Sequence, residues 1–353
     1  MVQQSSSTLP KNFEDLLAEG DEAAVLAVFD TCEVDARGGY WKSTALGFAN
    51  CPTTVARWLV DHGADVEAVD SGGMTPLHRH AGAWNGQPGL LLDLGANIES
   101  VTKHGETALH IAAGRHRAQN VRLLVERGAN VSAEAQRGLT PAAIAVKLCE
   151  NASIAETAEI LEILVAAGAV LSEDLRADAA RIGKQFEFHR DNFNRDKLAE
   201  ADAGLQKIYE LLKASPVQRR RMHDGSSDIV VTGSTWQQQH RELWDLLVPS
   251  QGPAATVQGE VIRITGRISD ELDRNGGGNW DRDFQRMADA LPEYLSSSTP
   301  LPAADLKAAR NATRLLKGRK RLAVDHAMLS EYAVRWVREN PQPIPLITPK
   351  YRR

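Results

Sequence analysis

The chain has 353 residues, of which 42% are hydrophobic and 25% charged, and its formal net charge is −5. This length exceeds a comfortable single domain and predicts two folding units. The sequence contains no run of 18 apolar residues, which counts against a membrane span, and an acidic balance counts against nucleic-acid binding.

Three cysteines, Cys32, Cys51 and Cys149, are spaced too widely and irregularly for a disulfide framework or a zinc site. They predict a reducing compartment. The first seven residues have neither the charged start nor the apolar core of a signal peptide. We therefore expect a cytoplasmic protein.

The charge is divided unevenly along the chain. Residues 1–170 hold 12 basic and 21 acidic residues, whereas residues 171–353 hold 29 and 25. The two parts thus carry net charges of opposite sign, which could help them to dock, although most of these charges are expected to be solvated.

The first part of the chain repeats itself with a period of about 32 residues. Threonines at positions 44, 75, 107 and 140 each open a unit, and the phrase Gly-Ala near positions 63, 95, 128 and 168 closes it. A Thr-Pro pair is typical of a helix start, since the hydroxyl caps free amides and proline fixes the first helical φ. A glycine after the second helix supplies the left-handed residue that ends it. Each unit is therefore predicted to be a pair of helices that stacks on its neighbours.

The phrases Thr75-Pro76-Leu77-His78 and Thr107-Ala108-Leu109-His110 resemble the opening of an ankyrin repeat. The resemblance covers residues 11–170 as about five units and implies an all-α solenoid. Asn12–Glu19 and Glu22–Asp30 are predicted to form an N-terminal capping pair, after a flexible segment at residues 1–10. In the family, the histidine of the phrase braces adjacent loops, so His78 and His110 are expected to be structural.

Several units depart from the family's pattern. The first has Thr44-Ala45-Leu46-Gly47 without proline or histidine, the second has Arg79-His80 where small residues are usual, and the fourth lacks the histidine. These departures put helix boundaries in doubt there, but not the architecture.

Residues 171–340 are predicted to form an α-helical domain that resembles no family. Helical patterns cover residues 171–215 and then 236–247, 256–272, 280–295, 303–317 and 322–339, with an exposed loop at 216–234. Four prolines between positions 341 and 349 predict an extended tail over residues 341–353.

Ankyrin arrays are overwhelmingly protein-binding modules, and they bind through loop tips and the inner helices. Mapping these positions onto the chain gives a candidate partner-binding set rich in aromatic, Met and Arg side chains, which are typical of interface hot spots. Its members are Tyr40, Trp41, Met74, Trp84, Lys103, His104, Glu106, Arg115, Arg137 and Leu139. Alternatively, Trp41 and Trp84 pack against neighbouring repeats, or the helical domain covers this face.

The resemblance implies a non-enzymatic protein that binds another protein, and a bacterial immunity or regulatory protein that neutralises or scaffolds its partner is one such case. The alternative is an enzyme or effector whose helical domain acts on a target that the repeats recruit. Glu260, Arg263 and Arg267 share a predicted helix face near Asp270, which suits an anion site or an ordinary salt bridge. A pocket at this cluster would favour the enzyme.

No further chemistry is indicated by motif. The glycines at 276–278 fit a turn better than a phosphate cradle, no Cys/His spacing suggests a metal, and no cofactor is expected. Of the remaining histidines, His80, His104 and His116 are expected to be more exposed. The basic runs Arg219–Arg221 and Lys317–Arg321 lack the interleaved aromatics of nucleic-acid sites.

Overall fold

A computed structural model describes residues 5–318 and 321–351, with the side chain of Arg321 left aside. The chain divides into two compact units. Unit 1 runs to Phe186 and resumes over Asn194–Val217, and unit 2 comprises Glu187–Phe193 and the chain from Gln218 onward. The expected boundary near residue 170 therefore differs from the observed division, because two further helices belong with the repeats.

Unit 1 begins with a small sheet and two short helices. Strand β1 (Ser6–Thr8) pairs in parallel with β2 (Cys32–Gly38), which pairs antiparallel with β3 (Ser43–Thr44). Between β1 and β2 lie α1 (Phe13–Glu19), α2 (Glu22–Ala27) and the 3-10 turn η1 (Val28–Asp30). The two predicted capping helices are thus present. Within the segment expected to be flexible, Ser6–Thr8 form β1, and residues 1–4 lie outside the described part.

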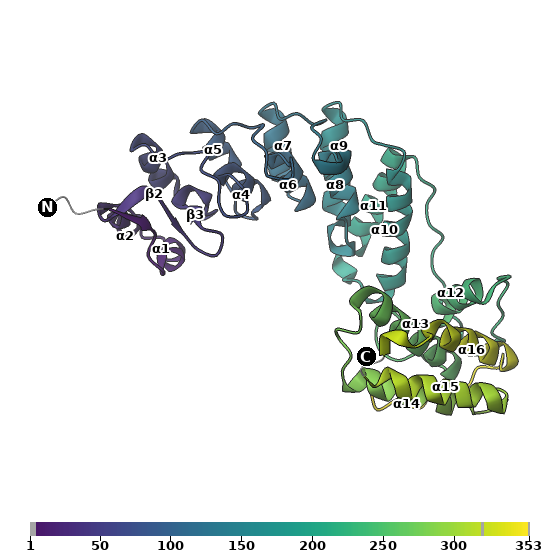
Figure 1. The fold of residues 1–353 in the computed structure, drawn as a ribbon. Helices are drawn as coiled ribbons and strands as arrows, with labels where there is room; N and C mark the ends of the chain where they lie inside the picture. The colour runs from purple at the N-terminus through teal and green to yellow at the C-terminus, as the bar shows by residue number, and fades with distance from the viewer. Residues whose placement is uncertain (1–4, 319–320, 352–353) are drawn as a thin grey trace. The chain divides into compact units, whose positions relative to one another are not determined.

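Four helix pairs follow (Figure 1). The inner elements are η2 (Ala45–Gly47), α4 (Pro76–Gly82), α6 (Ala108–Gly114) and α8 (Pro141–Lys147). The outer helices are α3 (Thr53–Asp61), α5 (Pro88–Asp93), α7 (Ala118–Glu126) and α9 (Ile154–Ala166), with the short turns η3 (Gln136–Gly138) and η4 (Asn151–Ser153) in the last connections. In both ribbon views these pairs stand side by side in chain order.

The threonines begin the inner helices, as the sequence predicts. Thr75, Thr107 and Thr140 are the N-caps of α4, α6 and α8. At Thr44 only a 3-10 turn forms, and the threonine side chain makes no capping bond. The missing proline and histidine of that unit explain the difference, because neither a fixed φ nor a reciprocal cap favours a longer helix there.

The glycine of each Gly-Ala phrase ends an outer helix in the left-handed region. Gly63, Gly95, Gly128 and Gly168 have φ values of 94°, 96°, 88° and 94°. The amide of the following alanine then donates back into the last turn, as from Ala129 to the Leu124 carbonyl at 3.0 Å. This arrangement satisfies carbonyl groups that a helix end would otherwise leave free.

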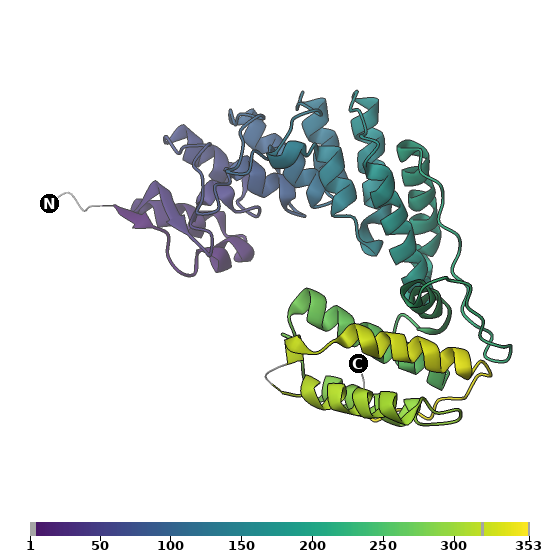
Figure 2. The same ribbon diagram turned by 45° about the vertical axis from the view of Figure 1, so that its right-hand side comes forward.

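A further helix pair, α10 (Leu175–His189) and α11 (Arg195–Leu212), continues the stack (Figure 2). The Arg181 guanidinium donates to the carbonyls of Val146, Lys147 and Cys149, which closes the end of α8. At Gly204, α11 approaches α9 so closely that a Cβ there would lie 2.9 Å from Ala155 Cα. The repeats therefore end in a pair that has the plan but not the signature of the others.

Unit 2 is helical, as predicted. Its helices are α12 (Trp236–Leu247), α13 (Val257–Asn275), α14 (Arg282–Leu295), α15 (Ala303–Leu316) and α16 (His326–Glu339), and short turns occur at η5 (Arg190–Asn192) and η6 (Arg321–Ala323). Helix α13 lies at the centre of the bundle and buries residues on all sides. In the described residues, no helix combines the length and apolar character needed to cross a bilayer.

The tail after Asn340 is extended but packed onto the bundle. The Leu346 amide donates to the Ala255 carbonyl at 3.0 Å, the Val257 amide donates to the Ile344 carbonyl at 2.8 Å, and Tyr351 is buried. Arg352 and Arg353 lie outside the described residues.

Candidate functional site

The signature histidines fix the loops between the repeats. Nδ1 of His78 accepts from the Thr75 amide at 3.3 Å, so Nε2 carries the proton and donates to the Glu106 carbonyl at 3.0 Å. His110 makes the same bonds with Thr107 and with the Leu139 carbonyl. Burial lowers the pKa of both imidazoles, which keeps them in this neutral form. Both histidines therefore have the bracing role that the sequence predicts.

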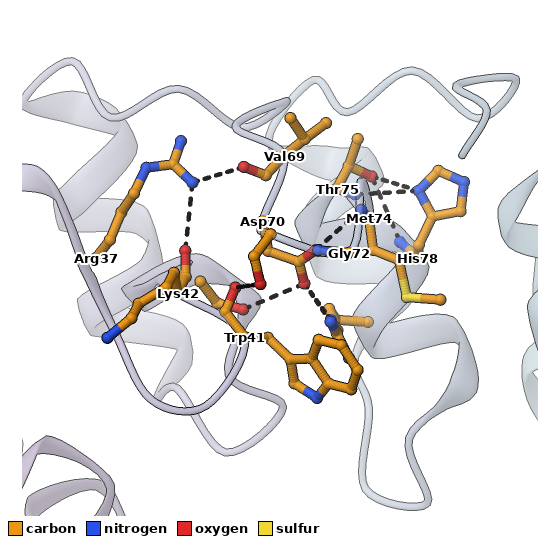
Figure 3. A network of polar contacts seen from close by, with 12 residues as sticks. Arg37, Trp41, Lys42, Val69, Asp70, Gly72, Met74, Thr75 and His78 are labelled. Carbon is orange, nitrogen blue, oxygen red and sulfur yellow. Dashed lines mark hydrogen bonds and ion pairs between the residues drawn. The ribbon is translucent and has the colours of Figure 1, made fainter. Parts of the chain in front are cut away.

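A carboxylate that the sequence analysis missed organises the second loop tip (Figure 3). Asp70 is buried and accepts from the amides of Gly72 at 2.7 Å and Met74 at 3.1 Å. On the other side it pairs with the Arg79 guanidinium. The tip that carries Met74 and the helix that carries Arg79 are thus fixed relative to each other.

The first tip, between β2 and β3, is tied to the same network. Arg37 Nη1 donates to the carbonyl of Lys42 at 3.3 Å and to that of Val69 at 2.6 Å (Figure 3). The Ser71 amide and hydroxyl both donate to the Trp41 carbonyl, at 2.8 and 2.6 Å. These bonds hold the backbone of Trp41 in place and do not involve its indole.

Two aromatic side chains project from this tip. Tyr40 is 86% exposed and Trp41 is 47% exposed, and their rings meet edge to face with centroids 4.9 Å apart. The Arg79 guanidinium lies 4.7 Å from the centre of the Trp41 ring, in cation–π contact. Asp70 thus orients Arg79, and Arg79 in turn supports one face of Trp41.

The exposed rings border an open cavity of about 460 Å³ on the inner side of unit 1. Its size lies within the range of small-molecule pockets. The lining residues come from α1, the first tip, η2, α4 and α6, and they include Glu14, Tyr40, Trp41, Phe48, Met74, Arg79, Ile111 and Arg115. Four residues of the predicted partner-binding set, Tyr40, Trp41, Met74 and Arg115, are therefore brought together here.

Trp84 follows Gly82 and Ala83, which line the edge of the cavity. Its side chain is 82% exposed and lies 4.8 Å below the Arg117 guanidinium. Hydrogen bonds hold the loop that carries it. His80 Nδ1 accepts from the Gln87 backbone amide at 3.0 Å. The Asn120 side-chain amide donates to the carbonyls of His80, Ala81 and Ala83. Trp41 contacts Arg79 and Trp84 contacts Arg117, each from the next repeat, so the contact with neighbouring repeats that the alternative expects is present although both indoles stay exposed.

The other predicted residues lie on the next two tips and do not line the cavity. Lys103, His104 and Arg137 are exposed, whereas Glu106 and Leu139 are half-buried. Glu106 and Leu139 supply the backbone carbonyls that accept from the signature histidines, so part of their role is structural. As partner contacts, all ten positions stay a prediction.

Comparisons with known proteins find ankyrin repeats in this part of the chain. Two family models of ankyrin repeats match the chain, one over residues 44–88 and the other over residues 91–156. Residues 44–156 are ankyrin repeats. A solved ankyrin-repeat domain from Acinetobacter baumannii is similar at 25% identity, covering 57% of this chain and 95% of that one, with a TM-score of 0.39. No curated protein matches the chain.

The ankyrin repeats make this chain a protein-interaction module. The matched residues include eight of the ten predicted contact positions, from Met74 to Leu139, together with the inner helices α4, α6 and α8. Tyr40 and Trp41 precede the matched segment and stand on the tip that leads into it.

The three histidines expected to be more exposed differ from one another. His80 is 1% exposed, and burial lowers its pKa to about 4. His116 is half-buried and hydrogen-bonds through its two ring nitrogens to Thr157 and to the Leu148 carbonyl, whereas His104 is exposed on its tip. His80 was misjudged because its position in the repeat predicts neither the irregular turn after α4 nor the burial that this turn produces. Within residues 5–318 and 321–351, no group of three potential metal ligands is found.

In unit 2, the Glu260 cluster is a buried ion pair. Glu260 and Arg263 are 0% and 1% exposed, and the guanidinium donates to both carboxylate oxygens at 2.8 and 2.6 Å. The Tyr351 hydroxyl donates to Glu260 at 2.7 Å, and burial beside this carboxylate raises the pKa of the phenol. Asp270 is apart from the pair and contacts Arg274 at the surface. A buried structural pair thus occupies the place where the enzyme alternative needs a pocket.

The glycine-rich segment forms a turn. Gly276 ends α13 in the left-handed region, and the buried Glu271 carboxylate accepts from the Asn279 amide at 2.6 Å. Helix α14 consequently begins at Arg282, after the Asp281 cap, and not at Trp280. A carboxylate facing the loop would repel a phosphate.

Of the two basic runs, the first has a structural member. Arg220 donates to the carbonyls of Trp244, Asp245 and Val248, which closes the end of α12, and it stacks 4.4 Å from the Phe188 ring. In the second run Lys317 pairs with Asp289, while Arg319 and Lys320 lie outside the described residues.

Proposed function

We propose that the chain recognises one partner protein through the cavity and the loop tips of its ankyrin unit. The observation that supports this most directly is the pair Tyr40 and Trp41, which are exposed beside the cavity although their backbone is held by the Asp70 and Arg37 network. Rigid aromatic residues beside a cavity lose little entropy on binding and are typical of interface hot spots.

We propose further that binding is itself the function, as in an immunity or regulatory protein that neutralises or scaffolds its partner. The alternative of an enzyme in unit 2 depends on Glu260 and Arg263, and their burial in an ion pair leaves them without access to a substrate. We therefore do not propose a reaction.

The test is capture of the partner from native lysate with the full chain and with a variant that carries Trp41→Ala, Met74→Ala and Arg137→Ala. We expect a single protein that the variant no longer retains, while its circular dichroism stays unchanged. The matched control places three substitutions on the outer helices and the connection after them, Arg122→Ala, Val165→Ala and Val170→Ala, all at exposed positions. Equal recovery by the wild type and the triple variant would contradict the proposed surface.

A further inference from the structure

We propose that the cavity binds an extended segment of the partner in which an apolar side chain stands between a basic and an acidic residue. The acidic residue faces Arg115, the basic residue faces Glu14, and the apolar side chain enters the space between them. This inference rests on the proposed function and specifies the chemistry of the partner.

The cavity contains charged side chains that have no partner within the described chain. Three charged side chains line it, Glu14, Arg79 and Arg115. Arg79 is already neutralised by Asp70. In the part of the chain that the structure describes, neither Glu14 nor Arg115 makes a side-chain hydrogen bond or ion pair. The cavity therefore offers one free anion and one free cation to a ligand.

These two free charges stand at opposite ends. Glu14 belongs to α1 and its carboxylate lies against Gly39, where a Cβ would be 2.8 Å from Oε1. Arg115 follows α6, and its Cγ lies 3.4 Å from the place of a Cβ on Gly82. The elements η2 and α4 stand between them in the stack. Three spacings of about 8–10 Å each, shortened by about 10 Å for the reach of the two side chains, correspond to about four to six extended residues.

Apart from these charges, much of the cavity lining is apolar or small. It includes the side chains of Trp41, Phe48, Met74 and Ile111. It also includes the small residues Gly47, Ala49, Gly82 and Ala83. An aromatic or branched aliphatic side chain would gain contacts with the aromatic side chains and the methionine. Because the two ends differ in charge, the segment has one preferred direction.

The experiment uses the full chain and a phage-displayed library of random peptides about a dozen residues long. The wild type and the variant Glu14→Lys with Arg115→Glu are panned in parallel. The control variant, Glu19→Lys with Arg122→Glu, has the same net charge and alters exposed residues outside the cavity.

We expect the wild type and the control to select peptides that carry a basic residue, an apolar residue and an acidic residue in one order. The charge-swapped variant should select the reverse order and bind the original peptides at least about tenfold more weakly, as loss of charge-assisted contacts implies. Selection of the same peptides by all three proteins, selection without charged residues, or no selected peptide would overturn the inference.

These outcomes are separable from a failure of the proposed function. If lysate capture depends on Trp41, Met74 and Arg137 but panning yields no dipolar peptide, the proposed binding surface is supported. The proposed charge pattern of the bound segment is then wrong. If the wild type forms a dimer that the charge swap abolishes, measured by light scattering, the occupant is a second copy of the chain and the partner segment is overturned.

Discussion

Polar side chains determine how the loops of the repeats are held. The signature histidines join α4 and α6 to the following tips, and partly exposed carboxylates accept from backbone amides in the loops after the outer helices. Glu67 accepts from the Asn97 amide and Glu99 from the Asn130 amide, each at 2.8 Å. Asp35 accepts from the Asp65 amide in the same way. These carboxylates recur with the period of the repeat, so their spacing in the sequence could have indicated a shared role. Acidic residues this close to a loop are more commonly solvated, and for that reason the role was not predicted.

Protonation of His80 is expected to destabilise unit 1. Its pKa is lowered to about 4 by burial, against 6.5 for an unfolded chain, so only the neutral ring fits the native loop. Stability is complete above pH 6.5 and is lost as the pH falls towards 4, at about 1.4 kcal/mol per pH unit and up to about 3 kcal/mol.

The measurement is urea unfolding of the wild type and of His80→Asn across this pH range. Asparagine can still accept from the Gln87 amide but does not titrate, so the variant should show a shallower loss of stability. Parallel curves for the two proteins would mean that His80 is not the titrating group.

Loss of one partner of the Glu260–Arg263 pair is expected to be costly. Arg263→Met leaves a buried carboxylate without its cation, which typically costs about 3–5 kcal/mol of unfolding free energy. The double variant Glu260→Leu with Arg263→Met removes both charges and should recover most of the loss. Chemical denaturation of both variants measures this, and an unaffected single variant would show that the pair is not buried in solution.

At the scale of the elements, the starts and ends of the repeat helices could be predicted from local chemistry. Thr75, Thr107 and Thr140 cap helices, and four glycines end them, because capping depends on neighbours within a few residues. The three strands were missed. Strands β1 and β3 have only three and two residues, and β1 pairs with a strand that begins more than twenty residues later, so no local periodicity indicated the sheet.

Because α11 lies so close to α9, we expect a glycine-to-alanine substitution in α11 to lower the free energy of unfolding instead of raising it. Alanine normally stabilises a helix by about 1 kcal/mol relative to glycine. At Gly204 the added Cβ would meet the backbone of Ala155, so Gly204→Ala is expected to destabilise unit 1 by about 1–3 kcal/mol, as overpacking does. Urea unfolding measures the change, and a stabilised variant would show that the two helices are not in this contact.

At the scale of the whole molecule, the division into two units determines which truncated chains should fold stably. A chain that ends at residue 170 loses α10 and α11 and exposes the side of α9 that α11 covers, whereas a chain that ends at Val217 keeps this terminal pair. The ends of a repeat stack need a cover with a polar outer face.

We therefore expect residues 5–217 to unfold in one cooperative transition and residues 5–170 to melt at lower temperature and to aggregate. Circular dichroism melting together with light scattering distinguishes the two. An equally stable shorter fragment would place the end of the ankyrin unit near residue 170, as the sequence signature alone suggests.

The sequence by itself determined the repeat, its family resemblance and most helix boundaries of both units, because periodicity, capping residues and helix-ending glycines act over short distances. It also predicted Tyr40, Trp41, Met74 and Arg115 as contact positions, since loop tips and inner helices recur at fixed positions in a repeat. Only the tertiary structure showed that these four share one cavity with Glu14 and Phe48, that Asp70 orients Arg79 against Trp41, and that Glu260 and Arg263 are buried. Burial, ion pairing and the joining of distant side chains depend on which elements pack together, and that information lies in the fold and not in any local stretch of residues.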